Sequence, residues 1–74
     1  SEELDERMWL FERVALELRT SEGMAVSRVI EDLRPKLALF AEEGLLHVVE
    51  DRIILSRKGM ALADVIAEAL LPDD

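Results

Sequence analysis

The segment of residues 45–55 constrains the fold most, because its periodicity differs from that of the rest of the chain. Branched apolar residues gather in two runs, 45–49 and 53–55, on either side of the pair Asp51-Arg52. This pattern is typical of a β-hairpin with a two-residue turn. A two-stranded sheet is only marginally stable in water, so the apolar side of the hairpin has to pack against helices.

The first helix that the sequence predicts begins near Glu3 and ends near Arg19. Its apolar residues recur at spacings of three and four, which places them on one face of the helix: Leu4, Met8, Phe11, Ala15 and Leu18. Acidic residues crowd its first turns and Arg19 lies in its last turn, the charge order that complements the helix dipole. Gly23 ends the turn that follows, where a positive φ is expected.

Two further helices are predicted between Gly23 and the hairpin. Any third strand is expected at Met24 and Ala25. A short helix over residues 25–32 then turns one set of apolar side chains inward: Val26, Val29, Ile30 and Leu33. Pro35 suits the first turn of the next helix, which Gly44 closes. Three residues of that helix are expected to face inward: Leu37, Phe40 and Ala41.

Ser56 is expected to cap the last helix, which runs through Leu70 and ends before Pro72 and the acidic pair Asp73-Asp74. The order of helix, short helix, helix, hairpin and helix predicts a winged-helix-like α+β domain, mostly α. Residues 1–74 form this single domain, whose predicted core includes Phe11, Leu18, Leu37, Phe40, Ile54, Leu62 and Ile66.

The composition excludes some kinds of cross-link, metal site and cellular location. The 74 residues include no cysteine, so no disulfide, thiolate metal ligand or cysteine-held iron–sulfur cluster can form within them. Nothing in the chain resembles a membrane span or a signal peptide. We therefore expect a cytoplasmic monomer that contacts no membrane. Because the chain begins at Ser1, we also expect it to be a piece of a longer protein.

The charge distribution argues against nucleic acid as a partner. The net charge is −8, and a duplex is bound mainly through Lys and Arg on its phosphates. The helix in the recognition position has Arg34 and Lys36 at its start but the pair Glu42-Glu43 at its end. The predicted wing tip, Asp51-Arg52, is neutral. One basic cluster lies near the wing, and we interpret it as a solvated rim: Arg52, Arg57 and Lys58.

No residue stands out as a catalytic, cofactor-binding or metal-binding group. His47 is the only histidine and is expected on the polar side of the hairpin, without a second ligand. The serines Ser21, Ser27 and Ser56 suit turns or caps. The adjacent acid pairs Glu31-Asp32, Glu42-Glu43 and Glu50-Asp51, and the pair Asp64 and Glu68 on the last helix, are expected to be solvated. Asp64 and Glu68 also repel mildly.

Trp9 lies off the main apolar stripe of the first helix. This position favours the edge of the core over an exposed contact surface for a neighbouring domain.

Three stretches together resemble the C-terminal domain of the oxygen-independent coproporphyrinogen III oxidase-like radical S-adenosylmethionine (SAM) proteins. They are residues 11–24 (FERVALELRTSEGM), 42–46 (EEGLL) and 52–71 (RIILSRKGMALADVIAEALL). In that family a helix ends in an L-R-T-x-E-G-like turn, and a helical pair, a G-L-L strand, a short hairpin and a last helix with a leucine pair follow. The likeness covers nearly the whole chain, although residues 23–42 form a shorter segment than the family usually has.

The resemblance implies an accessory role in porphyrin metabolism. The family's catalytic apparatus lies in an N-terminal barrel, where a C-x-x-x-C-x-x-C run holds a [4Fe–4S] cluster that cleaves SAM. The parent protein would be an oxidoreductase that decarboxylates coproporphyrinogen III, or a relative that binds and delivers haem. This domain would pack beside that barrel. The alternative from the residues alone is a free-standing winged-helix regulatory domain that binds protein or DNA.

Overall fold

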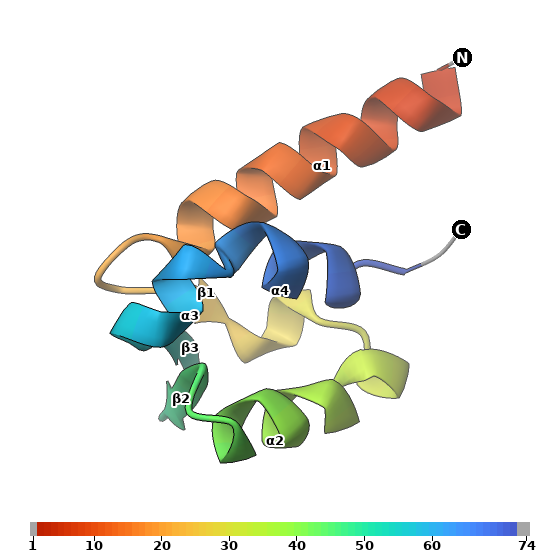
Figure 1. Ribbon diagram of the computed structural model, residues 1–74. Coiled ribbons are helices and arrows are strands. Elements are labelled where there is room, and N and C mark those ends of the chain that lie inside the picture. Colours follow the sequence, from red (N-terminus) through yellow and green to blue (C-terminus); the bar gives the residue numbers. More distant parts are fainter. Residues whose placement is uncertain (1, 73–74) are drawn as a thin grey trace.

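The computed structural model describes residues 2–72 and confirms a winged-helix-like α+β fold (Figure 1). Its elements in chain order are α1 (Glu2–Leu18), β1 (Met24–Ala25), the 3₁₀ turns η1 (Val26–Arg28) and η2 (Glu31–Leu33), α2 (Pro35–Glu42), β2 (Leu46–Val49), β3 (Arg52–Leu55), α3 (Arg57–Ala61) and α4 (Ala63–Ala69). Ser1, the pair Asp73-Asp74 and the side chain of Leu4 lie outside the described residues. No helix within residues 2–72 has the length and apolar character that crossing a membrane requires.

The hairpin is completed by the third strand expected at Met24. The three antiparallel strands lie in the order β1-β3-β2, with Met24 opposite Ile53 and Val48 also opposite Ile53 on the other side. The α1 and α4 helices pack together on one side of the molecule, and α2 lies on the opposite side (Figure 1). The sheet thus sits at one end of the helices, and its inner face closes the core.

The register of the hairpin decides which side chains enter the core. Ile53 and Leu55 are buried, whereas Ile54 points to the outer face and is half-buried, so the prediction of Ile54 as a core residue was wrong. Successive side chains of a strand alternate between the two faces of a sheet. The β3 strand begins at Arg52, one residue earlier than the predicted turn Asp51-Arg52 implied. The buried core comprises Val14, Ala15, Leu18, Met24, Val29, Leu37, Leu45, Leu46, Ile53, Leu55, Ala63, Ile66, Ala67, Leu70 and Leu71. Phe11 and Phe40 are partly buried against it.

The α1 helix ends at Leu18, so Arg19 lies just beyond its last turn rather than within it. The N-terminal half of α1 extends past the body of the domain (Figure 1), because α4 has only seven residues against the seventeen of α1. Met8 is 56% exposed and Trp9 61% exposed, and Trp9 shares the outward side of α1 with Leu16, which is 64% exposed. The predicted inward position of Met8 and the predicted edge-of-core position of Trp9 were both wrong.

The predicted short helix over residues 25–32 is absent. Two 3₁₀ turns take its place, and the extended residues Val29 and Ile30 separate them. Val29 is fully buried while Ile30 is 47% exposed, which corrects the prediction that both face inward. Val26 also continues the sheet, since its N–H donates to the Asp51 carbonyl at 2.7 Å. The extended backbone of Val29 and Ile30 then interrupts the segment, so no continuous helix forms.

The α2 helix begins at Pro35, and Gly44 closes it as predicted. Gly44 has a φ of 76°. Its N–H donates to the Ala41 carbonyl and the Leu45 N–H donates to the Phe40 carbonyl, which is the bonding of a Schellman end. Leu37 is buried but Ala41 is exposed, contrary to prediction. The buried stripe of this helix is therefore narrower than its sequence pattern indicated.

The predicted last helix is two helices. Ser56 caps α3 as expected, since its hydroxyl accepts the Gly59 N–H at 3.0 Å. The chain then breaks at Leu62, whose N–H bonds to the Gly59 carbonyl at 2.9 Å and whose φ and ψ are −114° and 21°. This tight turn directs α4 along α1. It leaves Leu62 39% exposed, so its assignment to the core was wrong, whereas Ile66 is fully buried as predicted.

Candidate functional site

The tip of the wing is acidic. The hairpin turn consists of Glu50 and Asp51, because β2 ends at Val49 and β3 already begins at Arg52. The predicted turn, the neutral pair Asp51-Arg52, was therefore displaced by one residue. Glu50 has a φ of 56°, the sterically costly backbone region for a residue other than glycine. Both carboxylate side chains are exposed and no lysine or arginine occupies the turn.

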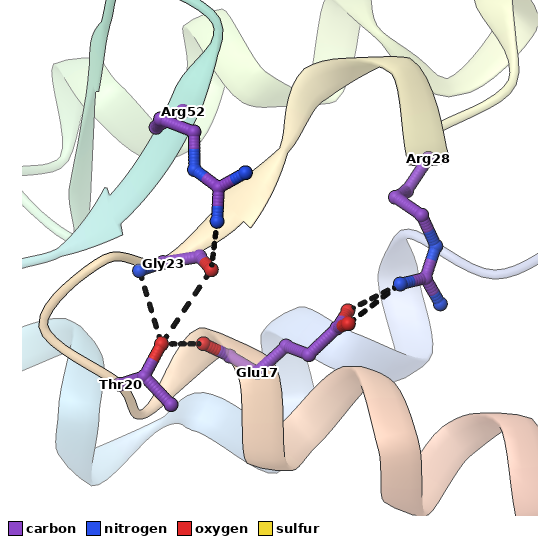
Figure 2. Close-up of polar contacts among 5 residues, drawn as sticks. All are labelled: Glu17, Thr20, Gly23, Arg28 and Arg52. Atoms are coloured by element: carbon purple, nitrogen blue, oxygen red, sulfur yellow. Dashed lines mark hydrogen bonds and ion pairs between the residues drawn. The ribbon is translucent and has the colours of Figure 1, made fainter.

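Arg52 is exposed, as are Arg57 and Lys58, which agrees with the interpretation of this cluster as a solvated rim. The Arg52 guanidinium donates from Nε to the Glu22 carbonyl at 3.0 Å. It also donates from Nη2 to the Gly23 carbonyl at 3.0 Å (Figure 2). These bonds hold the start of β3 against the turn that follows α1. Within the exposed cluster of Arg52, Arg57 and Lys58, Arg52 therefore has a structural role as well.

The turn clamped by Arg52 is the L-R-T-S-E-G stretch of the sequence. The Thr20 hydroxyl donates to the Glu17 carbonyl at 2.7 Å and accepts the Gly23 N–H at 3.1 Å (Figure 2). Gly23 has a φ of 69°, and a Cβ at this position would lie 2.0 Å from the Ile53 carbonyl oxygen. Glu17 also forms an ion pair with Arg28 at 2.6 Å. Threonine and glycine are thus both needed to bring β1 directly onto β3.

Most other basic side chains are bonded to the domain itself. Arg34 Nε donates to the Val29 carbonyl at 2.9 Å, and Lys36 Nζ donates to the Ala69 carbonyl at 3.1 Å. Lys58 Nζ contacts the Glu43 carbonyl at 3.4 Å. The guanidinium of Arg13 lies 5.1 Å from the centre of the Trp9 ring. The expected pair at the start of the recognition-position helix, Arg34 and Lys36, therefore serves to dock that helix.

The acidic pair on α4 has partners that the sequence did not indicate. Asp64 accepts from Arg19 at 3.0 Å, and Glu68 accepts from Arg7 at 2.8 Å. Arg7 also donates to the Pro72 carbonyl. Both carboxylates stay largely exposed, as predicted, so each pair contributes little to stability. The ion pairs nevertheless orient α4 along α1, and the expected repulsion between the two acids is offset by an arginine beside each.

A shallow hollow of about 390 Å³ opens on the outer face of the sheet beside the wing tip. Its floor is apolar and its rim carries two carboxylates; it is lined by Ser21, Glu22, Val49, Glu50, Arg52 and Ile54. His47 lies on the same outer face, opposite Ile54, and is exposed. Within residues 2–72 no three His, Cys, Asp or Glu side chains gather as a metal site.

The serines occupy positions without a nucleophile's surroundings. Ser56 is the cap of α3, and Ser21 and Ser27 are exposed in the turns on either side of β1. The cysteine-held cluster that the resemblance implies does not fit the donors of this chain, which has no cysteine. The described surface therefore suits binding to another molecule. Its features are an acidic wing, an apolar hollow on the outer face of the sheet and the exposed residues of α1.

Comparisons with known proteins add no relative. No protein-family model, no curated protein and no solved structure matches this chain.

Proposed function

We propose that this chain is the non-catalytic C-terminal domain of an oxygen-independent coproporphyrinogen III oxidase-like radical SAM protein. There it packs beside the barrel and helps to cover the site that accepts a porphyrinogen or haem. The family comes from the resemblance of residues 11–24, 42–46 and 52–71. Any cluster and SAM chemistry, whether oxidative decarboxylation of coproporphyrinogen III or haem delivery, belongs to the barrel.

One observation favours a protein over DNA as the partner: the basic side chains donate to groups of the domain itself. A winged helix that binds DNA presents several Lys and Arg to the phosphates. Here the arginines and lysines at the corresponding places, Arg34, Lys36 and Arg52, donate to backbone carbonyls of the domain, and the wing tip is Glu50-Asp51. The regulatory alternative is thereby weakened in its DNA-binding form.

The projecting half of α1 is the surface that best suits a neighbouring domain. Met8 and Trp9 are more than half exposed there, and Leu16 further along the helix is 64% exposed. Aromatic side chains and methionine are enriched where proteins contact one another. The side opposite α2 thus offers apolar area that a barrel would cover (Figure 1).

The test is association with a separately produced radical SAM barrel of this family that lacks its own C-terminal domain. Isothermal titration calorimetry should detect a complex with this chain, and Trp9→Ala should weaken it. Leu39→Ala is the matched control, because Leu39 is also 61% exposed but lies on α2, on the opposite side of the molecule. Absence of a complex with the barrel, together with binding of duplex DNA, would overturn the proposal in favour of the regulatory alternative.

A further inference from the structure

The β2 strand is an edge of the sheet. In the order β1-β3-β2 only β3 pairs with it, and within residues 2–72 no strand lies along its other side. The unpaired N–H and C=O groups of an edge strand are a template for another strand.

The register shows which backbone groups of β2 are unpaired. The Ser56 N–H donates to the Leu45 carbonyl at 2.9 Å, which makes these two residues a bonded pair. Bonded and non-bonded pairs alternate along an antiparallel ladder, so Leu46 and Val48 form non-bonded pairs with Leu55 and Ile53. Their N–H and C=O groups point away from β3, and no backbone bond joins them to a loop or helix in the described part of the chain. Leu46 is only 3% exposed, so Val48 is the residue of the two whose groups an added strand can reach.

The side chains show that the core is left open at the same edge. Val48 shares its face with Leu46, Ile53 and Leu55, which are all buried. Val48 itself is 45% exposed. The apolar inner face of the sheet is therefore uncovered at Val48, and one more strand would cover this position.

Acidic residues at both ends of β2 favour a partner segment with basic ends. Glu42 and Glu43 lie just before β2, and Glu50 and Asp51 lie just after it, while β2 itself carries no acid. Three exposed bases lie near these acids. Lys58 contacts the Glu43 carbonyl, Arg57 precedes Lys58, and Arg52 donates to carbonyls on the β1 side of the sheet. A second copy of this chain, with its net charge of −8, would bring acidic ends against acidic ends.

We propose that the β2 edge accepts an extended segment of a partner protein as a fourth strand. That segment alternates branched apolar residues and has lysine or arginine at both ends, complementary to the two acidic pairs. Backbone bonds to Val48 and apolar contact with its side chain would supply affinity, and the basic ends would supply selectivity. This inference does not depend on the radical SAM assignment.

A labelled peptide of the sequence KKVTVTVKK provides the probe. Fluorescence anisotropy should show binding to the chain that weakens as salt is raised, and EEVTVTVEE should not bind. Methylation of one alternate set of the peptide's backbone nitrogens should weaken binding about tenfold, while methylation of the other set should have no effect. No binding of the lysine peptide at low salt, or equal effects of both methylated sets, would overturn the proposal.

A pair of charge variants locates the binding. Glu43→Gln combined with Asp51→Asn should weaken the lysine peptide about fivefold. Glu31→Gln combined with Asp32→Asn removes the same charge away from β2 and is the control, and thermal melting checks both folds. Hydrogen exchange at the Val48 amide should slow when the peptide binds. Equal weakening by both double variants, or an unchanged Val48 amide, would show that only net charge attracts the peptide.

Discussion

Two residues, Gly23 and Arg52, hold the sheet against the turn that follows α1. Gly23 meets two demands at once, a positive φ and a backbone approach that leaves no room for a Cβ beside Ile53. Arg52, on the strand next to it, donates to the carbonyls of Glu22 and Gly23 rather than facing a ligand. The turn after α1 is therefore a packed junction between α1 and the sheet.

Gly23→Ala should lower the free energy of unfolding by about 2 to 4 kcal/mol, because it combines a left-handed alanine with a steric clash. Gly44→Ala is the matched control: Gly44 also has a positive φ, but nothing lies within 4 Å of its Cβ position. That variant should lose only about 1 kcal/mol. Urea denaturation compares the two, and an equal loss would show that β1 does not lie against β3 as described.

Glu50→Gly should raise the free energy of unfolding by up to about 1 kcal/mol, because glycine relieves the positive φ at the first turn residue. Asp51→Gly should instead lower it, since Asp51 has no positive φ to relieve and glycine adds entropy to the unfolded chain. Thermal melting of both variants is the measurement. Stabilisation by Asp51→Gly alone would place the turn one residue later.

At the scale of elements, the sequence pattern was sufficient wherever a local signal acts alone. Pro35, Gly44 and Ser56 mark helix ends through local chemistry: the ring of Pro35, the positive φ of Gly44 and the hydroxyl of Ser56. All three were predicted. The errors lie where distant contacts decide. The extended residues Val29 and Ile30 divide the predicted helix into two 3₁₀ turns, and the packing of α4 on α1 requires a break at Leu62. The ion pairs of Arg7 and Arg19 with α4 depend on that break and were missed for the same reason.

One substitution at the break and one after it test whether residues 57–69 form two helices. Ile66→Ala should cost about 2 to 5 kcal/mol, because Ile66 is fully buried on α4. Leu62→Ala should cost less than about 1 kcal/mol, because Leu62 is 39% exposed. A continuous helix from Ser56 would bury both side chains and make the two losses similar. Chemical denaturation of the two variants therefore separates one helix from two.

At the scale of the whole molecule, the acidic charge and the basic side chains have different distributions. Acids are exposed at the wing tip, at the end of α2 and along α1, whereas most of the bases are bonded within the domain or paired with acids. A winged-helix arrangement alone does not indicate DNA, because function depends on what the surface presents. The surface here presents carboxylates and exposed apolar side chains.

The most direct test of this account is a fluorescence anisotropy titration of the chain against mixed duplex DNA, at low salt and then at physiological salt. The acidic wing should repel the duplex within about a Debye length, roughly 8 Å at physiological salt, so no submicromolar binding is expected at either salt concentration. A known DNA-binding winged helix serves as the positive control. Submicromolar binding that persists at physiological salt would contradict the account and make a regulatory DNA-binding domain the preferred function.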